Sequence, residues 1–218
     1  MRVLVFGDSN SWGYLDDGSG QRYARRWPVE MARIIQDQKP EFEIIEDCLP
    51  GRTTDLPDPV MGAEFSGKAA LLSSLKAHQP LNLVLIMLGT NDFKARFSRT
   101  AGEIAQACQS LIQMVKDSGA GPHGWHAQTS AEVIMICPPC LSATADDNRW
   151  QRYDEWIGGR ETSLALPDAL AVICKTEQVG FIDANEGAES SLRDPIHWQA
   201  ETHHQFGIYM ADQLSRYM

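Results

Sequence analysis

The chain has 218 residues, of which 43% are hydrophobic, and this is enough to form the core of one domain. Its formal net charge is −10 and its lysines and arginines form no run, which argues against binding to a nucleic-acid backbone. The longest apolar run, Leu83 to Leu88, is too short to span a membrane. We therefore expect a single domain over residues 1–218, with neither nucleic acid nor membrane as a partner.

The start of the sequence and its cysteines favour a cytoplasmic protein. Met1-Arg2 leads directly into the apolar run Val3-Leu4-Val5-Phe6, without the spacer and cleavage site that a secretory signal carries. The five cysteines are an odd number, which favours reduced thiols over a disulfide framework.

Five apolar segments predict the strands of a buried sheet. Several are continuous apolar runs that do not alternate with polar residues, which is typical of strands covered on both faces. The predicted strands are Arg2–Phe6, Phe42–Cys48, Asn82–Leu88, Glu132–Cys137 and Gly180–Asp183.

Helical segments separate these strands. The clearest one combines a capping-box pair, Thr100 and Glu103, with an apolar stripe along one face. The predicted helices are about Pro28–Gln38, Gly67–His78, Ala101–Ser118, Pro167–Glu177 and Ala200–Tyr217. This alternation predicts an α/β fold with a five-stranded parallel sheet and helices on both faces. Two long segments, Pro50–Ser66 and Pro138–Thr162, are predicted loops, and loops of that length are usually functional or mobile.

Residues with catalytic potential follow four of the predicted strands. Ser9 comes after the first strand and Gly51 after the second. Asn91 follows the third strand, and Asp194 and His197 follow the fifth. Because ligands of an open parallel sheet bind beyond the carboxyl ends of its strands, we expect all of these residues at one edge.

These residue types suit acyl transfer. A serine hydroxyl needs a base to act as a nucleophile, and His197 can accept the proton of Ser9 while Asp194 holds the other imidazole N–H. The negative charge that develops on the substrate needs hydrogen-bond donors. The candidates are the backbone N–H groups of Ser9 and Gly51 and the side-chain amide of Asn91. Glycine at position 51 lets the backbone approach the substrate closely.

Four blocks in chain order resemble the SGNH hydrolases, also called GDSL-like lipases and esterases. The blocks are Gly7-Asp8-Ser9, Gly51, Gly89-Thr90-Asn91-Asp92 and Asp194-x-x-His197. The stretches Gly51–Thr54 and Met87–Lys94 are similar to the bacterial arylesterase and acyltransferase branch. The resemblance implies a flavodoxin-like three-layer sandwich and esterase activity without metal or cofactor. It also implies Ser9 as nucleophile, His197 and Asp194 as the rest of the triad, and Gly51 and Asn91 in the oxyanion hole.

Two positions differ from the family pattern. Asn10 stands where the family often has leucine, and this difference is expected to affect packing. Pro195 stands where glycine is common, and its fixed φ and missing N–H predict a stiffer loop around Asp194 and His197.

Other interpretations of single residues stay open. Ser9 can simply end a strand or cap a turn. Asp183, at the end of the fifth strand, is a rival orienting acid, and His203 and His204 are rival bases. A local structural role is expected for Asp92. Thr53 and Thr54 either fix the turn at Gly51 or are ordinary loop residues.

Bulky residues beside the four blocks are candidates for a substrate pocket, which is usually lined by apolar side chains. The candidates are Trp12, Tyr14, Phe93, Phe97 and Ile196, and each is nearly as well suited to the core. Bulky walls predict space for a short acyl group only. The tryptophans in or beside loops, Trp125, Trp150 and Trp156, are suited to contact a second subunit of a homo-oligomer if they are exposed.

The sequence thus predicts a serine esterase for short aryl or acetyl esters, with acyl transfer to alcohols as a second outcome. Three alternatives remain. One is a carbohydrate O-acetyl esterase that uses the same site, and another is a binding protein for acyl groups or carbohydrates without turnover. The third rests on Cys137-Pro138-Pro139-Cys140, a Cys-x-x-Cys pattern that is also found in thiol–disulfide exchange proteins.

Overall fold

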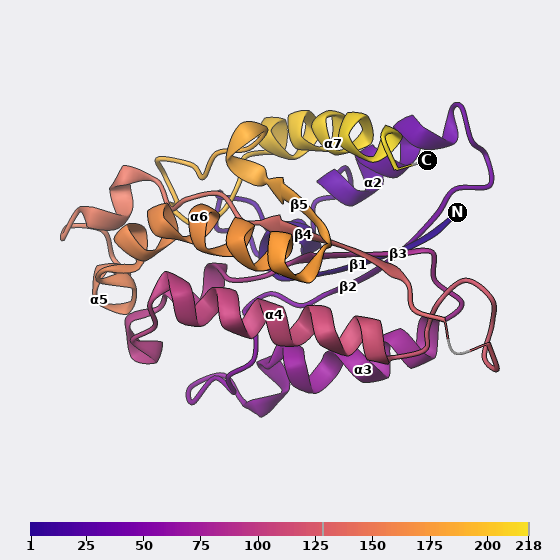
Figure 1. Ribbon diagram of the computed structural model, residues 1–218. Coiled ribbons are helices and arrows are strands. Elements are labelled where there is room, and N and C mark those ends of the chain that lie inside the picture. The colour runs from indigo at the N-terminus through magenta and orange to yellow at the C-terminus, as the bar shows by residue number, and fades with distance from the viewer. Residues whose placement is uncertain (128, 218) are drawn as a thin grey trace.

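The computed structural model describes residues 1–127 and 129–217, and its centre is a five-stranded parallel sheet (Figure 1). The strands are β1 (Arg2–Gly7), β2 (Glu43–Cys48), β3 (Leu83–Met87), β4 (Glu132–Cys137) and β5 (Gly180–Asp183). Their spatial order is β2-β1-β3-β4-β5, and every neighbouring pair is parallel. All five predicted strands are confirmed, with small differences at their ends.

Helices cover both faces of this sheet (Figure 1). One face carries α2 (Trp27–Gln36) and α7 (Ala200–Ser215), which pack against each other. The opposite face carries α3 (Gly67–His78), α4 (Ala101–Asp117) and α6 (Gly159–Glu177). Two short helices, α1 (Ser9–Trp12) and α5 (Tyr153–Trp156), lie in the connections. The three-layer α/β/α sandwich is therefore confirmed.

The alternating directions of strand side chains divide the core in two. In β1, Leu4 and Phe6 pack with α3, α4 and α6, whereas Val3 and Val5 pack with α2 and α7. β3 is buried at every position because it lies at the centre of the sheet. Two cores explain the continuous apolar runs in the sequence, since a strand covered on both faces has no polar side.

The predicted start of α6 was wrong. The helix begins at Gly159, so Pro167 lies inside it. A proline inside a helix has no N–H for the carbonyl four residues earlier, which here belongs to Ser163. The thiol of Cys140 donates to that carbonyl oxygen at 3.4 Å and replaces the missing bond. The predicted loop Pro138–Thr162 is therefore partly helical, because it contains α5 and the first residues of α6.

Candidate active site

The carboxyl edge of the sheet brings the four sequence blocks together around Ser9. Ser9 is the first residue of α1 and follows β1 after Asp8, the N-cap of that helix. Asn91 lies in a short 3-10 helix (Thr90–Phe93) after β3, the strand next to β1. The connections of the sheet change direction between β1 and β3, which is where open α/β sheets bind ligands.

Ser9, His197 and Asp194 form a hydrogen-bonded chain. The Nε2 of His197 lies 3.1 Å from the Oγ of Ser9, and its Nδ1 lies 2.7 Å from the Oδ2 of Asp194. The Oδ1 of Asp194 accepts a hydrogen bond from the backbone N–H of Ile196 at 3.1 Å, which holds the carboxylate in its turn. Pro195 contributes its carbonyl, which accepts from the backbone N–H of Ser142 at 3.1 Å. The loop that carries the base and the acid is thus anchored to the loop after β4.

The electrostatics of Asp194 suit an orienting acid. Partial burial favours the neutral carboxyl, but the hydrogen bond and charge of His197 outweigh burial and lower the pKa of Asp194. The carboxylate is therefore ionised at neutral pH. An ionised Asp194 keeps a proton on the Nδ1 of His197, and this leaves Nε2 free to accept the proton of Ser9.

A second carboxylate, Asp8, contacts the candidate oxyanion donors. Its Oδ1 accepts from the backbone N–H of Asn10 at 3.0 Å and caps α1, and its Oδ2 accepts from the side-chain amide of Asn91 at 3.5 Å. Burial raises the pKa of Asp8 to about 6, although Asn10, His197 and Thr90 oppose the shift. Asp8 is therefore the residue that orients the Asn91 amide, a role that the sequence analysis did not consider.

Three donors remain for an oxyanion beside Ser9. Within residues 1–127 and 129–217, the backbone N–H groups of Ser9 and Gly51 donate to no protein acceptor. The side-chain amide of Asn91 has two N–H donors. One of them donates to Asp8 Oδ2, and the other stays available for the substrate. The arrangement can thus receive negative charge on an oxygen that lies next to Ser9.

The turn at Gly51 requires glycine. Its φ is +92°, in the left-handed region that glycine adopts freely. A Cβ at this position would lie 2.6 Å from the Cε of Met61. The buried Arg52 ties the turn to the sheet, because its guanidinium donates to the carbonyl oxygens of Gly7 and Asp47 at 3.2 and 2.6 Å. Arg52 is a further residue that sequence reasoning missed.

Asp92 joins the segment after β2 to the segment after β3. Its Oδ2 accepts from the backbone N–H of Thr54 at 2.8 Å, and its Oδ1 accepts from the Thr54 hydroxyl and, at 2.9 Å, from Arg99. Arg99 also donates to Asp55 at 2.6 Å. The structural role expected for Asp92 is therefore correct, but it acts between distant segments. The sequence contains no spacing that pairs Asp92 with Thr54, so only the fold reveals this contact.

The five predicted pocket residues fall into two groups. Phe93 and Ile196 are each 3% exposed and belong to the hydrophobic core, which is the alternative considered for them. The half-buried residues are Trp12, Tyr14 and Phe97. The ring of Tyr14 lies against the imidazole of His197, with their centroids 4.4 Å apart. Tyr14 therefore covers one face of the candidate base.

The rival acid and bases have other partners. Asp183 caps its own turn, because its Oδ1 accepts from the backbone N–H of Asn185 at 3.0 Å. His203 is fully buried, its Nδ1 accepts from the backbone N–H of Trp27 at 3.4 Å, and burial lowers its pKa to about 4. His204 lies 3.2 Å from Glu30. These contacts favour Asp194 and His197 over their rivals.

Cys137 and Cys140 are both free thiols in this structure. Burial raises the pKa of each, whereas a reactive thiolate requires a lowered pKa. Cys140 also donates to the carbonyl that Pro167 leaves unpaired. The geometry thus supports a structural role for Cys140 and gives the redox interpretation no support.

The three tryptophans considered for a subunit contact differ in exposure. Trp125 is 64% exposed, Trp150 is half-buried, and Trp156 is 1% exposed within the hydrophobic core. The idea that Trp156 is available to a second subunit was therefore wrong, because it is buried in its own protomer. An oligomeric state stays a prediction.

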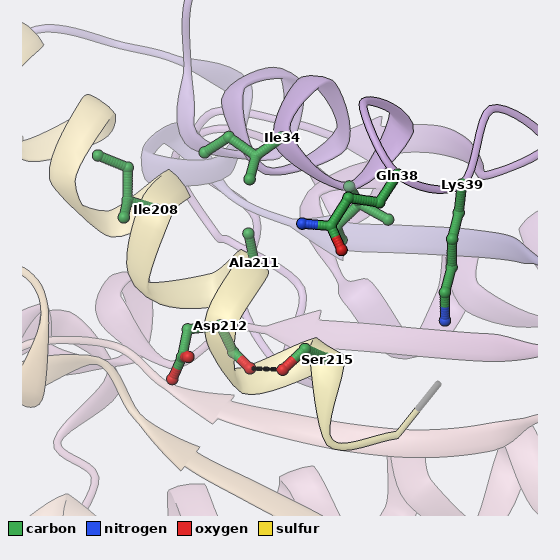
Figure 2. Close-up of a pocket in the computed structure, with 8 residues that line it drawn as sticks. Ile34, Gln38, Lys39, Ile208, Ala211, Asp212 and Ser215 are labelled. Atoms are coloured by element: carbon green, nitrogen blue, oxygen red, sulfur yellow. Dashed lines mark hydrogen bonds between the residues drawn. The ribbon is translucent and has the colours of Figure 1, made fainter.

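A groove of about 500 Å³ lies between the last turns of α2 and α7, apart from the four blocks (Figure 2). Ile34, Ile208 and Ala211 form its apolar part. Its serine, Ser215, donates to the backbone carbonyl of Asp212 at 2.6 Å. The groove thus presents no serine–histidine pair, and the candidate active site lies at Ser9.

The described residues were also searched for a metal-binding group and for a membrane-spanning helix. Between residues 1 and 217, with residue 128 left aside, no group of three or more His, Cys, Asp or Glu side chains is arranged to hold a metal ion. In the same part of the chain, no helix combines the length and the apolar character that crossing a membrane requires.

Comparisons with known proteins agree with this geometry. The model of the GDSL-like Lipase/Acylhydrolase family matches residues 5–205, a range that includes all four blocks. No match was found among curated proteins. Among solved structures, a carbohydrate acetylesterase from Sinorhizobium meliloti is 32% identical with a TM-score of 0.88, and the alignment covers 100% of this chain and 99% of that chain. The native aryl esterase of M. smegmatis is 31% identical with a TM-score of 0.88 and the same coverage of 100% and 99%.

A putative arylesterase from Agrobacterium tumefaciens is similar as well, at 26% identity and a TM-score of 0.84, with 100% of this chain and 99% of that chain covered. The family match spans most of the chain, and the hydrogen-bonded Ser9, His197 and Asp194 lie within it. The chain therefore belongs to the GDSL-like lipase/acylhydrolase family and is a carboxylic-ester hydrolase.

Proposed function

We propose that this protein hydrolyses short-chain carboxylic esters, aryl or acetyl, through an acyl-Ser9 intermediate. The observation that carries the proposal is the hydrogen-bonded chain from Ser9 Oγ to His197 Nε2 at 3.1 Å and from His197 Nδ1 to Asp194 at 2.7 Å. The reaction uses neither a metal nor an organic cofactor, as the resemblance to SGNH hydrolases implies.

In the first half of the reaction, Ser9 Oγ attacks the ester carbonyl while His197 Nε2 accepts the hydroxyl proton. The carbonyl oxygen becomes an oxyanion, and the backbone N–H groups of Ser9 and Gly51 and the amide of Asn91 stabilise its charge. The imidazolium of His197 then gives its proton to the leaving alcohol. Asp194 stabilises the charge on His197 throughout.

In the second half, water or an alcohol resolves acyl-Ser9. His197 accepts a proton from the attacking hydroxyl, and the same three donors receive the second oxyanion. As the bond from the acyl carbon to Ser9 Oγ breaks, the imidazolium of His197 returns the proton to Ser9 Oγ. Water yields the free acid, whereas an alcohol yields a new ester. The half-buried ring of Tyr14 lies beside His197, and the ring of Trp12 lies near Tyr14. These rings support both a small acyl group and competition between alcohol and water.

A specific observation favours a second candidate, an esterase that removes acetyl groups from carbohydrates. The S. meliloti carbohydrate acetylesterase matches this chain over its full length at 32% identity. Both candidates use the same triad and differ in the alcohol part of the substrate. A binding protein without turnover is disfavoured, because the nucleophile, base and acid are in hydrogen-bond contact.

Turnover of para-nitrophenyl acetate by the wild type and by Ser9→Ala tests the proposal. We expect kcat to fall by about 10⁴- to 10⁶-fold in the variant, and we expect a fluorophosphonate to label Ser9 alone. Ser110→Ala is a matched control, since Ser110 lies on α4 away from the site. Retained activity in Ser9→Ala would refute an acyl-Ser9 mechanism.

Three further comparisons define the substrate. The ratio of kcat/KM for acetyl over octanoyl esters measures the space for the acyl group, and we expect it to exceed one. The ratio for phenyl acetate over peracetylated glucose separates the arylesterase from the carbohydrate esterase. The yield of new ester as methanol is added measures acyl transfer, and a yield of free acid alone would exclude it.

A further inference from the structure

Lys94 is a buried cation beside the candidate oxyanion hole. It directly follows the 3-10 helix that carries Asn91, and its side chain is only 3% exposed. Its Nζ lies 3.7 Å from the Oδ2 of Asp58, 3.9 Å from the Sδ of Met61 and 5.7 Å from the ring centre of Trp156. Within residues 1–127 and 129–217, this ion pair with Asp58 is loose, and no shorter hydrogen bond from the Lys94 ammonium to an oxygen accompanies it. A buried charge held so loosely is costly.

The acidic residues around Lys94 are engaged by arginines. Asp58 accepts from Arg96 at 2.7 Å, and Glu155 accepts from Arg96 at 2.9 Å and from Arg152 at 2.8 Å. Asp58 Oδ1 is occupied as well, by backbone N–H groups of its own loop. Three cations therefore face two carboxylates, and Lys94 shares Asp58 Oδ2 with Arg96, which lies closer to it at 2.7 Å against 3.7 Å. This local excess of positive charge contrasts with a chain whose formal net charge is −10.

Met61 lies between this ammonium and Gly51. Its Cε is 2.6 Å from the point that a Cβ on Gly51 would occupy, and its Sδ contacts Lys94 Nζ. Met61 is 40% exposed, so its flexible side chain borders solvent. A thioether is a weak acceptor for an ammonium group. The Met61 side chain therefore separates the Lys94 ammonium from the turn at Gly51.

We propose that Lys94 is a specificity-determining residue that binds a carboxylate carried by the ester substrate, a short distance from the scissile carbonyl. The inference rests on the proposed esterase function and adds a substrate class to it, namely esters with an anionic acyl or alcohol part. The carboxylate replaces the Met61 thioether as the partner of the ammonium. Such a charge-assisted hydrogen bond in a buried site supplies binding energy that a neutral ester does not gain.

The first test compares anionic and neutral esters of similar size in the wild type and in Lys94→Met. On the alcohol side the pair is para-acetoxybenzoate and its methyl ester, and on the acyl side it is monoethyl succinate and ethyl pentanoate. We expect Lys94→Met to lower kcat/KM for the anionic member of at least one pair by about 10- to 100-fold, with less than about a threefold change for the neutral member. Lys175→Met, at an exposed lysine of α6, is the matched control and should change neither.

The pattern of losses decides between the proposal and its alternatives. Equal losses for both members of each pair, or no loss for either, would overturn it and indicate a purely structural lysine. Failure of the wild type to hydrolyse even the neutral esters would refute the proposed function instead. In that case calorimetric binding of para-hydroxybenzoate to the wild type and to Lys94→Met still tests the carboxylate site.

The pH dependence gives an independent test. Burial lowers the pKa of Lys94 to about 8, so its charge is lost as the pH rises through that value. The groups that face it are Asp58, Glu155, Arg96 and Arg152. Although burial opposes each shift, the pKa values of Asp58 and Glu155 are lowered by their hydrogen bonds to arginines, and the pKa of Arg96 is raised by its two carboxylate partners, so these three groups keep their charges between pH 7 and pH 9. The preference of the wild type for the anionic ester should therefore decline from pH 7 to pH 9. A preference that is constant with pH, or one that declines equally in Lys94→Met, would contradict the proposal.

Discussion

Asp194 and Asp8 both support the residues around Ser9, but they face different chemical groups. Asp194 faces the imidazole of His197, which can carry a positive charge, and its pKa is lowered. Asp8 is 1% exposed and faces the neutral amide of Asn91, and its pKa is raised to about 6. Burial raises the pKa of Asp8, whereas at the partly buried Asp194 the hydrogen bond and charge of His197 help to overcome burial. The comparison shows that burial and the partner together decide the protonation of a carboxylate. Four predictions test this difference between the two carboxylates.

The largest effect is expected at Asp194. Asp194→Asn removes the acceptor that keeps the proton on His197 Nδ1, and we expect kcat to fall by about 10⁴-fold. Asp183→Asn is the matched control, because Asp183 caps its own turn, and it should change kcat by less than about threefold. Steady-state kinetics with para-nitrophenyl acetate measures both. A larger loss in Asp183→Asn than in Asp194→Asn would reverse the assignment of the acid.

The next effect concerns the amide that Asp8 orients. Asn91→Ala should lower kcat by about 10²- to 10³-fold, since it removes one oxyanion donor. Asp8→Asn should lower kcat by about 10- to 100-fold, because the Asn91 amide loses its ionised partner. The double variant should be no worse than Asn91→Ala, since Asp8 acts through that amide. Additive losses would show that Asp8 acts on the reaction by another route.

The two carboxylates should affect stability with opposite signs as pH changes. The pKa of Asp8 rises from 3.8 to about 6 on folding, so the folded state holds the proton more tightly than the unfolded state. Its contribution is present below pH 4 and is lost as the pH rises through 6, by on the order of 2–3 kcal/mol. Asp194, with a lowered pKa, contributes stability at neutral pH that is lost as the pH falls through its folded pKa. Urea unfolding from pH 2.5 to pH 7.5 measures both, because the loss at Asp194 occurs below pH 3.8.

In that experiment Asp8→Asn should gain stability relative to the wild type as the pH rises, and Asp194→Asn should lose stability. Identical pH dependence of the two variants would show that the amide and the imidazole are equivalent partners, contrary to the comparison.

The smallest effect is expected at Asp92, a buried carboxylate that joins two loops. Thr54→Val removes the hydroxyl that donates to Asp92 and leaves the Thr54 backbone contact in place. We expect a loss of about 1 kcal/mol in the free energy of unfolding, or about 2–4 °C in Tm, and less than a fivefold change in kcat. Thr144→Val, at an exposed hydroxyl, is the control. A severe loss of activity with unchanged Tm would place Thr54 in the chemistry.

Much of the fold and of the site could be predicted because the relevant signals are local. Apolar segments, several of them continuous, predicted all five strands, and the Thr100–Glu103 pair marked the start of α4. The four blocks and their order identified Ser9, Gly51, Asn91, Asp194 and His197 before any contact was known. Parallel strands place their carboxyl ends at one edge, so the order of the blocks was enough to predict that they meet.

Other features depend on contacts between distant segments. The helix α6 continues through Pro167, and the Cys140 thiol, from another segment, meets the Ser163 carbonyl that Pro167 leaves without a partner. No pattern in the sequence predicts the hydrogen bonds of Asp8 with Asn91 and of Asp92 with Thr54. The same is true of the burial of Lys94 near Asp58 and Trp156. Burial and partners determine the cost of a charge, and both arise only when the chain is folded. The residue types and their order along the chain are therefore enough to identify the groups that can do the chemistry. The burial, the partners and the protonation of these groups follow only from the tertiary structure.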